Sequence, residues 1–305
     1  MSTKYIYLIQ GKAELVKVFF ELHNRPSSRA IFLTYDQELN GAIYFPKSTW
    51  SQGRNRLLDE AKKMGSAEYY IFLDDDIQFI KGSFDSFEKC LEKWNPSVGF
   101  PVFHPKTIDT PLSINSHFNG KPWIQLEKQV CVFADASFMA IHRDVISDGI
   151  VVPLLEKFDD VSWWFTSSTQ QLLIFNLYQN TVLQFNKIVI ADSLHRNYPK
   201  NSYLQAQKDW LNRQFKRPFK DERKLMRNIF SVAILSKLLK ESIQFRNGKA
   251  LYSFLTCLKV LKLSLTYKIR NTHKLSESDL RSVIRKDSEL FLIYESANKP
   301  KAHEI

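Results

Sequence analysis

A strongly apolar run that ends in three consecutive carboxylates constrains this chain more than any other feature of its sequence. Residues 69–73 are aromatic and β-branched and predict a buried strand, and Asp74-Asp75-Asp76 follow directly. Carboxylates placed together at a strand end repel one another unless a cation offsets their charge. Their hard oxygen atoms suit Mg²⁺ or Mn²⁺, ions that keep positions open for water and substrate phosphates. The segment therefore predicts a metal site for a phosphate-bearing ligand, and a solvated acidic turn is the simpler alternative.

Strand-like and helix-like segments alternate over the first two thirds of the chain, which predicts an α/β fold with a mixed, mostly parallel sheet flanked by helices. Helices are expected at residues 54–64 and 83–94, where apolar side chains recur at helical spacing, and Ser83 is a suitable N-cap for the second. Strands are expected at residues 4–9, 30–34, 42–45, 69–73, 98–103, 130–141 and 185–191.

The cysteines and the hydropathy pattern indicate the compartment. Three cysteines occur among 305 residues, and their wide spacing fits neither a metal site nor a disulfide framework, as expected in a reducing environment. No apolar run approaches the roughly 18 residues of a transmembrane helix, and residues 1–10 read as a strand rather than as a signal peptide. The sequence therefore predicts a cytoplasmic protein.

Positive charge is concentrated in the last third of the chain. Residues 201–305 hold 22 Lys and Arg against 10 Asp and Glu, whereas residues 1–200 hold 21 against 22. Because the hydropathy pattern changes in the same region, we expect an α/β domain over residues 1–205 and a basic α-helical region over residues 206–305.

Gly53-Arg54-Asn55 opens the predicted helix that precedes the acidic strand. Free backbone amides at a helix N-terminus, with a guanidinium nearby, suit a nucleotide or its diphosphate. Ordinary helix capping with a surface arginine is the alternative for this segment alone.

With three later segments, this arrangement resembles the nucleotide-sugar glycosyltransferases of the GT-A fold, in which a hydrophobic strand ends in a metal-binding DXD motif. Residues 130–148 resemble the family's small-residue loop and the strand and helix after it. Asp159-Asp160 stand at the family's acidic motif, usually Glu-Asp, and His195 stands where many members carry a late histidine. The likeness covers residues 4–200 and does not reach the basic tail.

The resemblance implies a donor site built from Mn²⁺ or Mg²⁺ and a nucleoside diphosphate sugar, with UDP as the expected nucleotide. Asp76 is the expected direct metal ligand, and His195 completes the metal site. Asp74 reaches the metal through water or binds the ribose, and Asp75 serves either purpose. A divalent ion suits this reaction because it neutralises the leaving diphosphate as a Lewis acid.

Three more residues are expected at the donor. Asp36, which follows the second predicted strand, matches an acid that contacts the nucleobase in the family, although a turn-forming aspartate is an equal alternative. Arg54 is expected at the diphosphate. Asp135 is expected to contact the donor sugar or the acceptor.

Glycosyl transfer also requires a base for the acceptor hydroxyl. Asp160 aligns with the aspartate of the acidic motif and is the expected base, and the choice between it and Asp159 stays open. A single carboxylate base predicts one in-line displacement with inversion at the anomeric carbon. The alternative is that both residues cap the helix that carries Trp163 and Trp164.

The tail predicts basic amphipathic helices at residues 222–242 and 249–270. Such helices can lie on an anionic membrane surface, which suits an enzyme that extends a glycan or lipid-linked acceptor at the inner membrane face. Packing of their apolar stripes on the first domain is an equal alternative.

Two other functions fit parts of the sequence. Magnesium-dependent phosphohydrolases of the haloacid dehalogenase type also carry Asp-x-Asp at a strand end, but those acids follow the first strand, and here about seventy residues precede them. A nucleic-acid-binding protein would use the basic tail, yet the tail has no recognition motif and its apolar content favours packing. Nucleic acid is therefore not an expected partner.

Overall fold

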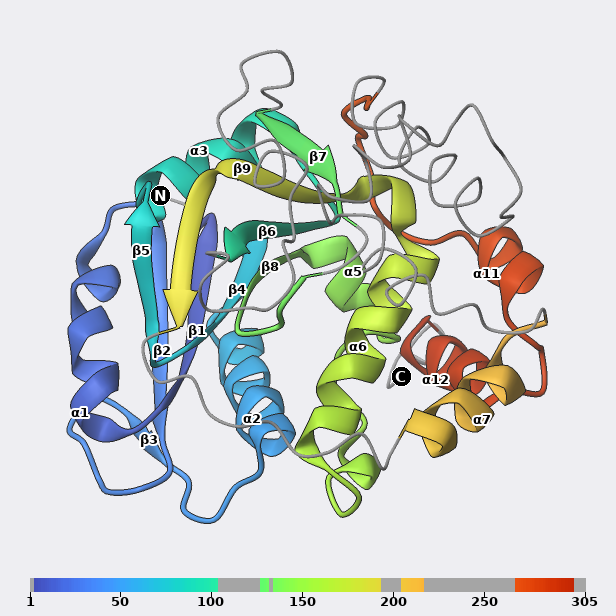
Figure 1. Cartoon of the computed structure of the whole chain (residues 1–305), viewed down its shortest axis with the longest axis horizontal. Helices are drawn as coiled ribbons and strands as arrows, with labels where there is room; N and C mark the ends of the chain where they lie inside the picture. The colour runs from blue at the N-terminus through green and yellow to red at the C-terminus, as the bar shows by residue number, and fades with distance from the viewer. Residues whose placement is uncertain (1–2, 104–126, 132–133, 193–203, 217–266, 299–305) are drawn as a thin grey trace, which may run out of the picture.

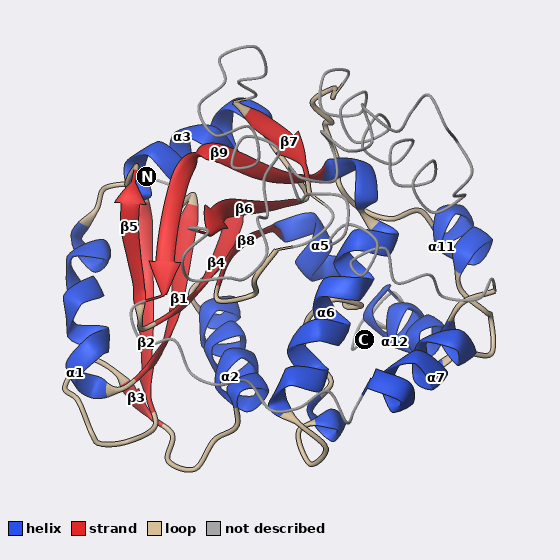
Figure 2. Ribbon diagram, in the orientation of Figure 1, coloured by secondary structure: helices blue, strands red, loops and turns tan. Residues whose placement is uncertain are grey.

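The computed structural model describes residues 3–103, 127–131, 134–192, 204–216 and 267–298. In this part of the chain a single sheet runs in the order β3-β2-β1-β4-β8-β6-β9-β5, and β7 also pairs with β9 (Figures 1 and 2). The strands are β1 (Tyr5–Gly11), β2 (Ser28–Thr34), β3 (Ile43–Tyr44), β4 (Tyr69–Asp74), β5 (Ile77–Lys81), β6 (Val98–Phe103), β7 (Lys128–Val130), β8 (Phe138–His142) and β9 (Val182–Asp192).

The sheet is mixed, with a parallel half that supplies the candidate site. Strands β3, β2, β1 and β4 are parallel to one another, and β6 is parallel to β9. Strand β8 runs antiparallel between β4 and β6, and β5 and β7 are antiparallel to β9. The carboxyl ends of β1, β2, β4, β6 and β9 therefore lie at one edge of the sheet, where ligands bind in open α/β folds. The predicted α/β fold with a mixed sheet is confirmed.

Helices cover both faces of the sheet, and β1 shows why. Ile6 and Leu8 point into the apolar cluster shared with α2, whereas Tyr5, Tyr7 and Ile9 point into the opposite cluster, with α3 and the first helical turns. All seven residues of β1 are buried, as expected for a strand that is covered on both faces. The helical segments are α1 (Ala13–Val16), η1 (Lys17–Asn24), α2 (Trp50–Lys63), α3 (Phe84–Trp94), α5 (Arg143–Asp148), η2 (Glu156–Phe158), α6 (Trp163–Leu177), η3 (Gln179–Thr181), α7 (Leu204–Gln214), α11 (Glu277–Val283) and α12 (Glu289–Asn298).

Helix α7 packs against α6 and α12, and α11 lies at the outer side of this C-terminal group (Figure 1). A third apolar cluster joins Phe165 and Leu172 of α6 to Trp210 of α7, Leu280 of α11 and Leu290 of α12. The described part of the C-terminal region therefore shares a core with the last helix of the α/β part. Within that part of the chain, no helix is long and apolar enough to cross a membrane.

Several expected boundaries differ from the structure. Helix α2 begins at Trp50, about one turn before the predicted start, because Thr49 and Gln52 form a capping box there. The strand expected over residues 130–141 is two strands, β7 and β8, and β5 was not expected at all. Ser83 caps α3 as predicted.

Most of the two predicted tail helices lies outside the described residues. Residues 222–242 and most of residues 249–270 lie outside the described ranges. The last four residues of the second segment, 267–270, are described and are not helical.

Candidate functional site

The aspartate triplet lies at the carboxyl edge of the sheet, where β4 ends. Asp74 is the last residue of β4, and Asp75 and Asp76 form the turn that leads to β5. All of these carboxylates are half-buried, so each can face a ligand while it keeps contact with the protein.

Asp74 is fixed by groups from α2. Its Oδ1 atom accepts a hydrogen bond of 2.7 Å from Nη2 of Arg54, and the indole Nε1 of Trp50 lies 3.3 Å from the same oxygen. Its backbone N–H donates to the carbonyl of Ser137, just before β8. The carboxylate therefore has a defined orientation at the end of the strand.

Arg54 is buried, with 1% of its surface exposed. Its guanidinium carbon lies 4.1 Å from the centre of the Trp50 ring and 5.4 Å from that of Phe72, a cation–π arrangement. Burial lowers the pKa of Arg54, and the negative charges of Asp74 and Asp135 oppose that shift. Among the described residues, its Nε and Nη1 atoms have no hydrogen-bond partner. Arg54 thus contacts Asp74 from inside the protein and is not a surface arginine.

Asp75 and Asp36 both accept hydrogen bonds from the backbone that follows β1. The Oδ2 atom of Asp75 lies 2.6 Å from the amide nitrogen of Lys12, and Oδ1 of Asp36 lies 2.9 Å from that of Ala13. Gly11 permits this approach, because a Cβ atom there would lie 2.1 Å from Cβ of Asp75. The two acids therefore hold the turn after β1 at the same edge as the triplet.

The end of β9 lies beside the triplet. Ile77, the first residue after the triplet, pairs with Asp192, the last residue of β9. His195, the expected late metal ligand, lies outside the described residues. Within the described ranges, no group of at least three His, Cys, Asp or Glu side chains could hold a metal ion. The carboxylates present are hard oxygen donors that fit Mn²⁺ or Mg²⁺ in chemistry.

Asp135 lies in the loop that precedes β8. Its Oδ1 atom accepts a hydrogen bond of 2.8 Å from the backbone N–H of Ser137, whose carbonyl accepts from Asp74. Asp135 is half-buried and close enough to Arg54 to affect its charge. The loop is thus placed against the end of β4.

Asp159 and Asp160, the acidic pair that follows β8 in the chain, lie in different environments. Asp159 accepts hydrogen bonds from the hydroxyls of Thr49 and Ser51 at the start of α2, and from Thr166 of α6 at 2.9 Å. Asp160 is exposed, and no described residue forms a hydrogen bond with its carboxylate. The capping residue of α6 is Ser162, whose hydroxyl accepts from the N–H of Trp164, so neither acid fills that position.

The triplet Gly53-Arg54-Asn55 lies inside α2, and each residue contacts a different element. Gly53 lies against β1, since a Cβ there would be 2.4 Å from Oε1 of Gln10. Arg54 reaches β4 as described, and Asn55 forms hydrogen bonds in both directions with the backbone of Leu154. The expectation that these residues open the helix was therefore wrong, because the helix starts earlier.

Sequence reasoning missed the hydroxyls of Thr49 and Ser51 and the amide of Asn55 as partners of residues 154–159. One signal was available: Thr49 and Gln52 have the spacing of a capping box, which places the helix start at Trp50 and the hydroxyls beside its first turn. Their partners 99 to 110 residues away leave no local signal.

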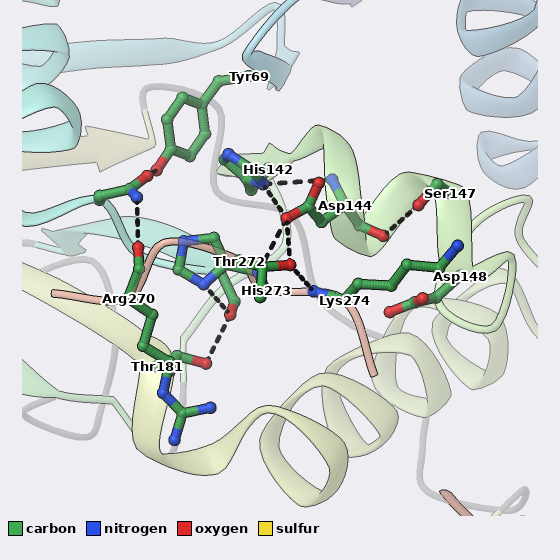
Figure 3. Close-up of polar contacts among 12 residues, drawn as sticks. Tyr69, His142, Asp144, Ser147, Asp148, Thr181, Arg270, Thr272, His273 and Lys274 are labelled. Carbon is green, nitrogen blue, oxygen red and sulfur yellow. Dashed lines mark hydrogen bonds and ion pairs between the residues drawn. The ribbon is translucent and has the colours of Figure 1, made fainter. Parts of the chain in front are cut away.

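A second polar cluster lies near the opposite end of β4 (Figure 3). The backbone N–H of His273 donates to Asp144, and its imidazole packs edge to face on that of His142. Its Nδ1 atom lies 3.0 Å from the hydroxyl oxygen of Ser97. Burial, together with the neighbouring His142, lowers the pKa of His273 to about 4. These contacts attach residues 267–276 to the α/β part.

Asp148 belongs to the same cluster. It is fully buried and accepts hydrogen bonds from the hydroxyl of Tyr178 at 2.7 Å and from the backbone of Leu275 at 3.0 Å. Burial raises the pKa of Asp148 to about 6, and those hydrogen bonds oppose the shift. Next to this cluster, a cavity of about 860 Å³ lies between α2, α5 and α12, at the start of β4 and away from the aspartate triplet.

Comparisons with known proteins show which solved structures have a similar fold. No protein family model matches the sequence, and no curated protein matches it. The solved structure of GalNAc-T7 with UDP, GalNAc and Mn²⁺ resembles it with a TM-score of 0.51 at 10% identity, over 88% of this chain and 58% of that one. This chain thus spans less than two thirds of that protein.

Two further structures give lower scores. The mannosyltransferase PcManGT from Pyrobaculum calidifontis, in complex with GDP-Man and Mn²⁺, has a TM-score of 0.42 at 12% identity, over 97% of this chain and 86% of that one. S. aureus TarS in complex with UDP has a TM-score of 0.43 at 10% identity, over 86% and 83%.

The sheet order and the similarity to GalNAc-T7 define the class of architecture. The chain has the GT-A fold of nucleotide-sugar glycosyltransferases.

Proposed function

We propose that the protein is a metal-dependent glycosyltransferase that moves a sugar from a nucleoside diphosphate sugar to a hydroxyl of a glycan or lipid-linked acceptor. The observation that carries this proposal is the carboxylate cluster at the end of β4, which Arg54 orients from inside a GT-A fold. The similarity of the fold to GalNAc-T7, whose solved structure holds UDP and Mn²⁺, supports it.

Asp76 and Asp74 would hold Mn²⁺ or Mg²⁺, with His195 as a third ligand. The register that brings the end of β9 beside Ile77 supports that choice, because His195 follows β9 by three residues. Bound there, the ion would supply Lewis-acid neutralisation of the leaving diphosphate. Asp75 holds the turn after β1 and so shapes the donor side of the site.

Asp36 and Asp135 would complete the donor side. Asp36 is exposed beside the end of β2, where it could accept a hydrogen bond from a nucleobase while it holds Ala13. Asp135 would contact the donor sugar or the acceptor. Arg54 acts on the donor through Asp74, because its buried guanidinium faces that carboxylate. UDP is the proposed nucleotide.

Asp160 would be the general base. An exposed carboxylate without a protein partner among the described residues is free to accept the proton of the acceptor hydroxyl. The oxygens of Asp159 already accept hydrogen bonds from three hydroxyl groups, which makes it the poorer base. One base on the acceptor side implies a single displacement with inversion at the anomeric carbon.

The proposal is tested by nucleotide binding and donor turnover. Calorimetry with UDP, with and without Mn²⁺, should show metal-dependent binding, and a panel of nucleotide sugars should show metal-dependent hydrolysis of at least one donor. Asp76→Asn should abolish metal-dependent binding of UDP. Asp160→Asn should keep that binding and lower turnover by about 10²–10⁴-fold, as for loss of a general base. Folded protein that binds no nucleotide under any of these conditions would refute the assignment.

The site of action is part of the proposal. We place the enzyme in the cytoplasm, on the inner face of a membrane, where its basic C-terminal region would contact anionic lipid. Sedimentation with vesicles of anionic or of neutral lipid tests this, and equal binding to both vesicles or to neither would contradict it.

A further inference from the structure

We propose that Asp159 and Asn55 are positioning residues, which fix the exposed carboxylate of Asp160 relative to Asp74 by attaching residues 154–160 to α2. This inference rests on the proposed glycosyl transfer, since it assigns the donor side to Asp74 and the acceptor side to Asp160. It gives Asp159 a role distinct from that of the base.

The first attachment is formed by Asn55. Its Oδ1 accepts from the backbone N–H of Leu154 at 2.7 Å, and its Nδ2 donates to the carbonyl of Leu154 at 3.0 Å. Nδ2 also donates to Glu156 at 2.7 Å. Paired hydrogen bonds from one amide to both backbone groups of one residue fix its orientation as well as its distance.

The second attachment is formed by Asp159. Ser51, which is fully buried, and Thr49 donate their hydroxyls to this carboxylate from the first turn of α2, and Thr166 donates from α6. The negative charge lies beside the N-terminal turns of both helices, where their dipoles favour it. Hydrogen bonds to an ionised acceptor are about twice as strong as neutral ones.

Helix α2 carries these attachments to the donor side. Ser51 lies one turn before Arg54, and Arg54 forms the buried ion pair with Asp74 at 2.7 Å. Backbone hydrogen bonds between successive turns fix the geometry of an α-helix, so Ser51 and Arg54 keep a constant separation. Asp160, the neighbour of Asp159, is thereby held at a constant position relative to the end of β4.

The chemical consequence concerns the distance between base and reacting carbon. Misplacement by about 1 Å from a change away from the chemistry can cost on the order of 10²-fold in rate. Loss of either attachment should therefore lower kcat and leave the donor side unchanged.

Kinetics of single variants form the first arm of the test. Asp159→Asn, Asn55→Ala and Ser51→Ala should each lower kcat about 10- to 100-fold, while the KM for the donor and the Kd for UDP with Mn²⁺ stay within about twofold. Thr166→Val is the matched control, because it removes a hydrogen bond to Asp159 from α6 and leaves the attachment to α2 intact. Asn176→Ala is the control for Asn55→Ala, because its hydrogen bond among the described residues, to the carbonyl of Leu172, stays within α6. A loss of kcat in Thr166→Val equal to that in Ser51→Ala would overturn the proposal.

A distance measurement forms the second arm and needs no substrate. Met64, at the end of α2, and Val161 are 51% and 54% exposed, so both can be replaced by cysteine and spin-labelled, with Cys257→Ser as background. The described Cys90 and Cys131 are buried. The parent should give one narrow distance, which broadens in Asp159→Asn and Asn55→Ala and stays narrow in Thr166→Val.

The two arms separate the inference from the proposed function. A parent that binds no UDP refutes the proposed function, and the spin-label distances still decide whether residues 154–160 are attached to α2 in this way. A narrow distance in both Asp159→Asn and Asn55→Ala overturns the positioning role, whatever their kinetics.

Discussion

Nη2 of Arg54 lies 2.7 Å from Oδ1 of Asp74, and the two partners differ in exposure, with 1% of the arginine side chain and 24% of the aspartate side chain accessible to water. This difference in exposure predicts that removing one partner or the other lowers the free energy of unfolding by different amounts. Asp74→Asn leaves a buried guanidinium without its ion-pair partner, with only the weaker influence of Asp135 remaining, and should lower the free energy of unfolding by about 3–5 kcal/mol.

Arg54→Met should cost less, about 1–2 kcal/mol, because water can solvate the remaining Asp74 carboxylate. Urea unfolding of both variants measures the difference, with Asp76→Asn as a control for loss of a neighbouring charge. Equal destabilisation by Asp74→Asn and Arg54→Met would contradict the buried pair.

Two glycines at the same edge of the sheet predict opposite outcomes. A Cβ at Gly11 would lie 2.1 Å from Cβ of Asp75, an atom that cannot move without the backbone. Gly11→Ala should therefore separate Asp75 from Lys12 and cost about 1–3 kcal/mol in stability, with weaker binding of UDP and Mn²⁺.

Gly53→Ala should be nearly neutral. The new methyl group would meet the flexible end of Gln10 and lie in ordinary contact with Leu33, and the gain in helix propensity of about 1 kcal/mol offsets the rearrangement. Thermal unfolding and calorimetry with UDP compare the two variants. Tolerance of alanine at residue 11 would show that the close approach of Gly11 to Asp75 is not required.

The buried histidine of the second cluster predicts acid sensitivity. His273 has a folded-state pKa of about 4, below the ordinary histidine value of 6.5, because burial and His142 disfavour its charged form. Its contribution to stability is therefore complete above pH 6.5 and is lost as pH falls towards 4. The advantage of the parent over His273→Gln should shrink steadily between pH 6.5 and 4 in urea unfolding. A difference that stays constant over this range would contradict the neutral buried histidine.

Asp148, in the same cluster, predicts the opposite dependence of stability on pH. Its pKa of about 6 lies above the ordinary value of 3.8, because burial disfavours the carboxylate. Its contribution to stability is complete below pH 3.8 and is lost as pH rises through 6. Measured against Asp148→Asn, the parent should therefore become relatively less stable as pH rises from 4 to 7. Both variants can be measured in one pH series. If the stability difference between parent and variant changed with pH in the same direction for both, the assigned pKa shifts of His273 and Asp148 would be refuted.

Much of the architecture could be predicted because its signals are local. Residues 69–73 are apolar on both faces and end at acids, and Ser83 precedes an amphipathic stretch, so β4 and α3 lie where the sequence places them. The strand β5 was missed because it pairs with β9, more than a hundred residues away, and its own five residues are mostly exposed or half-buried.

The candidate site could be predicted in its residue types and only in part in its contacts. The edge location of Asp74, Asp75 and Asp76 follows from the strand pattern. The burial of Arg54 and the hydroxyl partners of Asp159 depend on how α2 packs against β4 and α6, which no local pattern encodes. The proposed metal and base roles remain predictions.

The apolar surface that α6 shares with α7, α11 and α12 has a practical consequence for protein production. A shortened version that stops after the sheet would present Phe165 and Leu172 to solvent, at the helix whose start adjoins the acidic pair. Aggregation in such a truncated protein would reflect that uncovered surface and would say nothing about the chemistry of the aspartates, so activity assays should begin with the intact polypeptide.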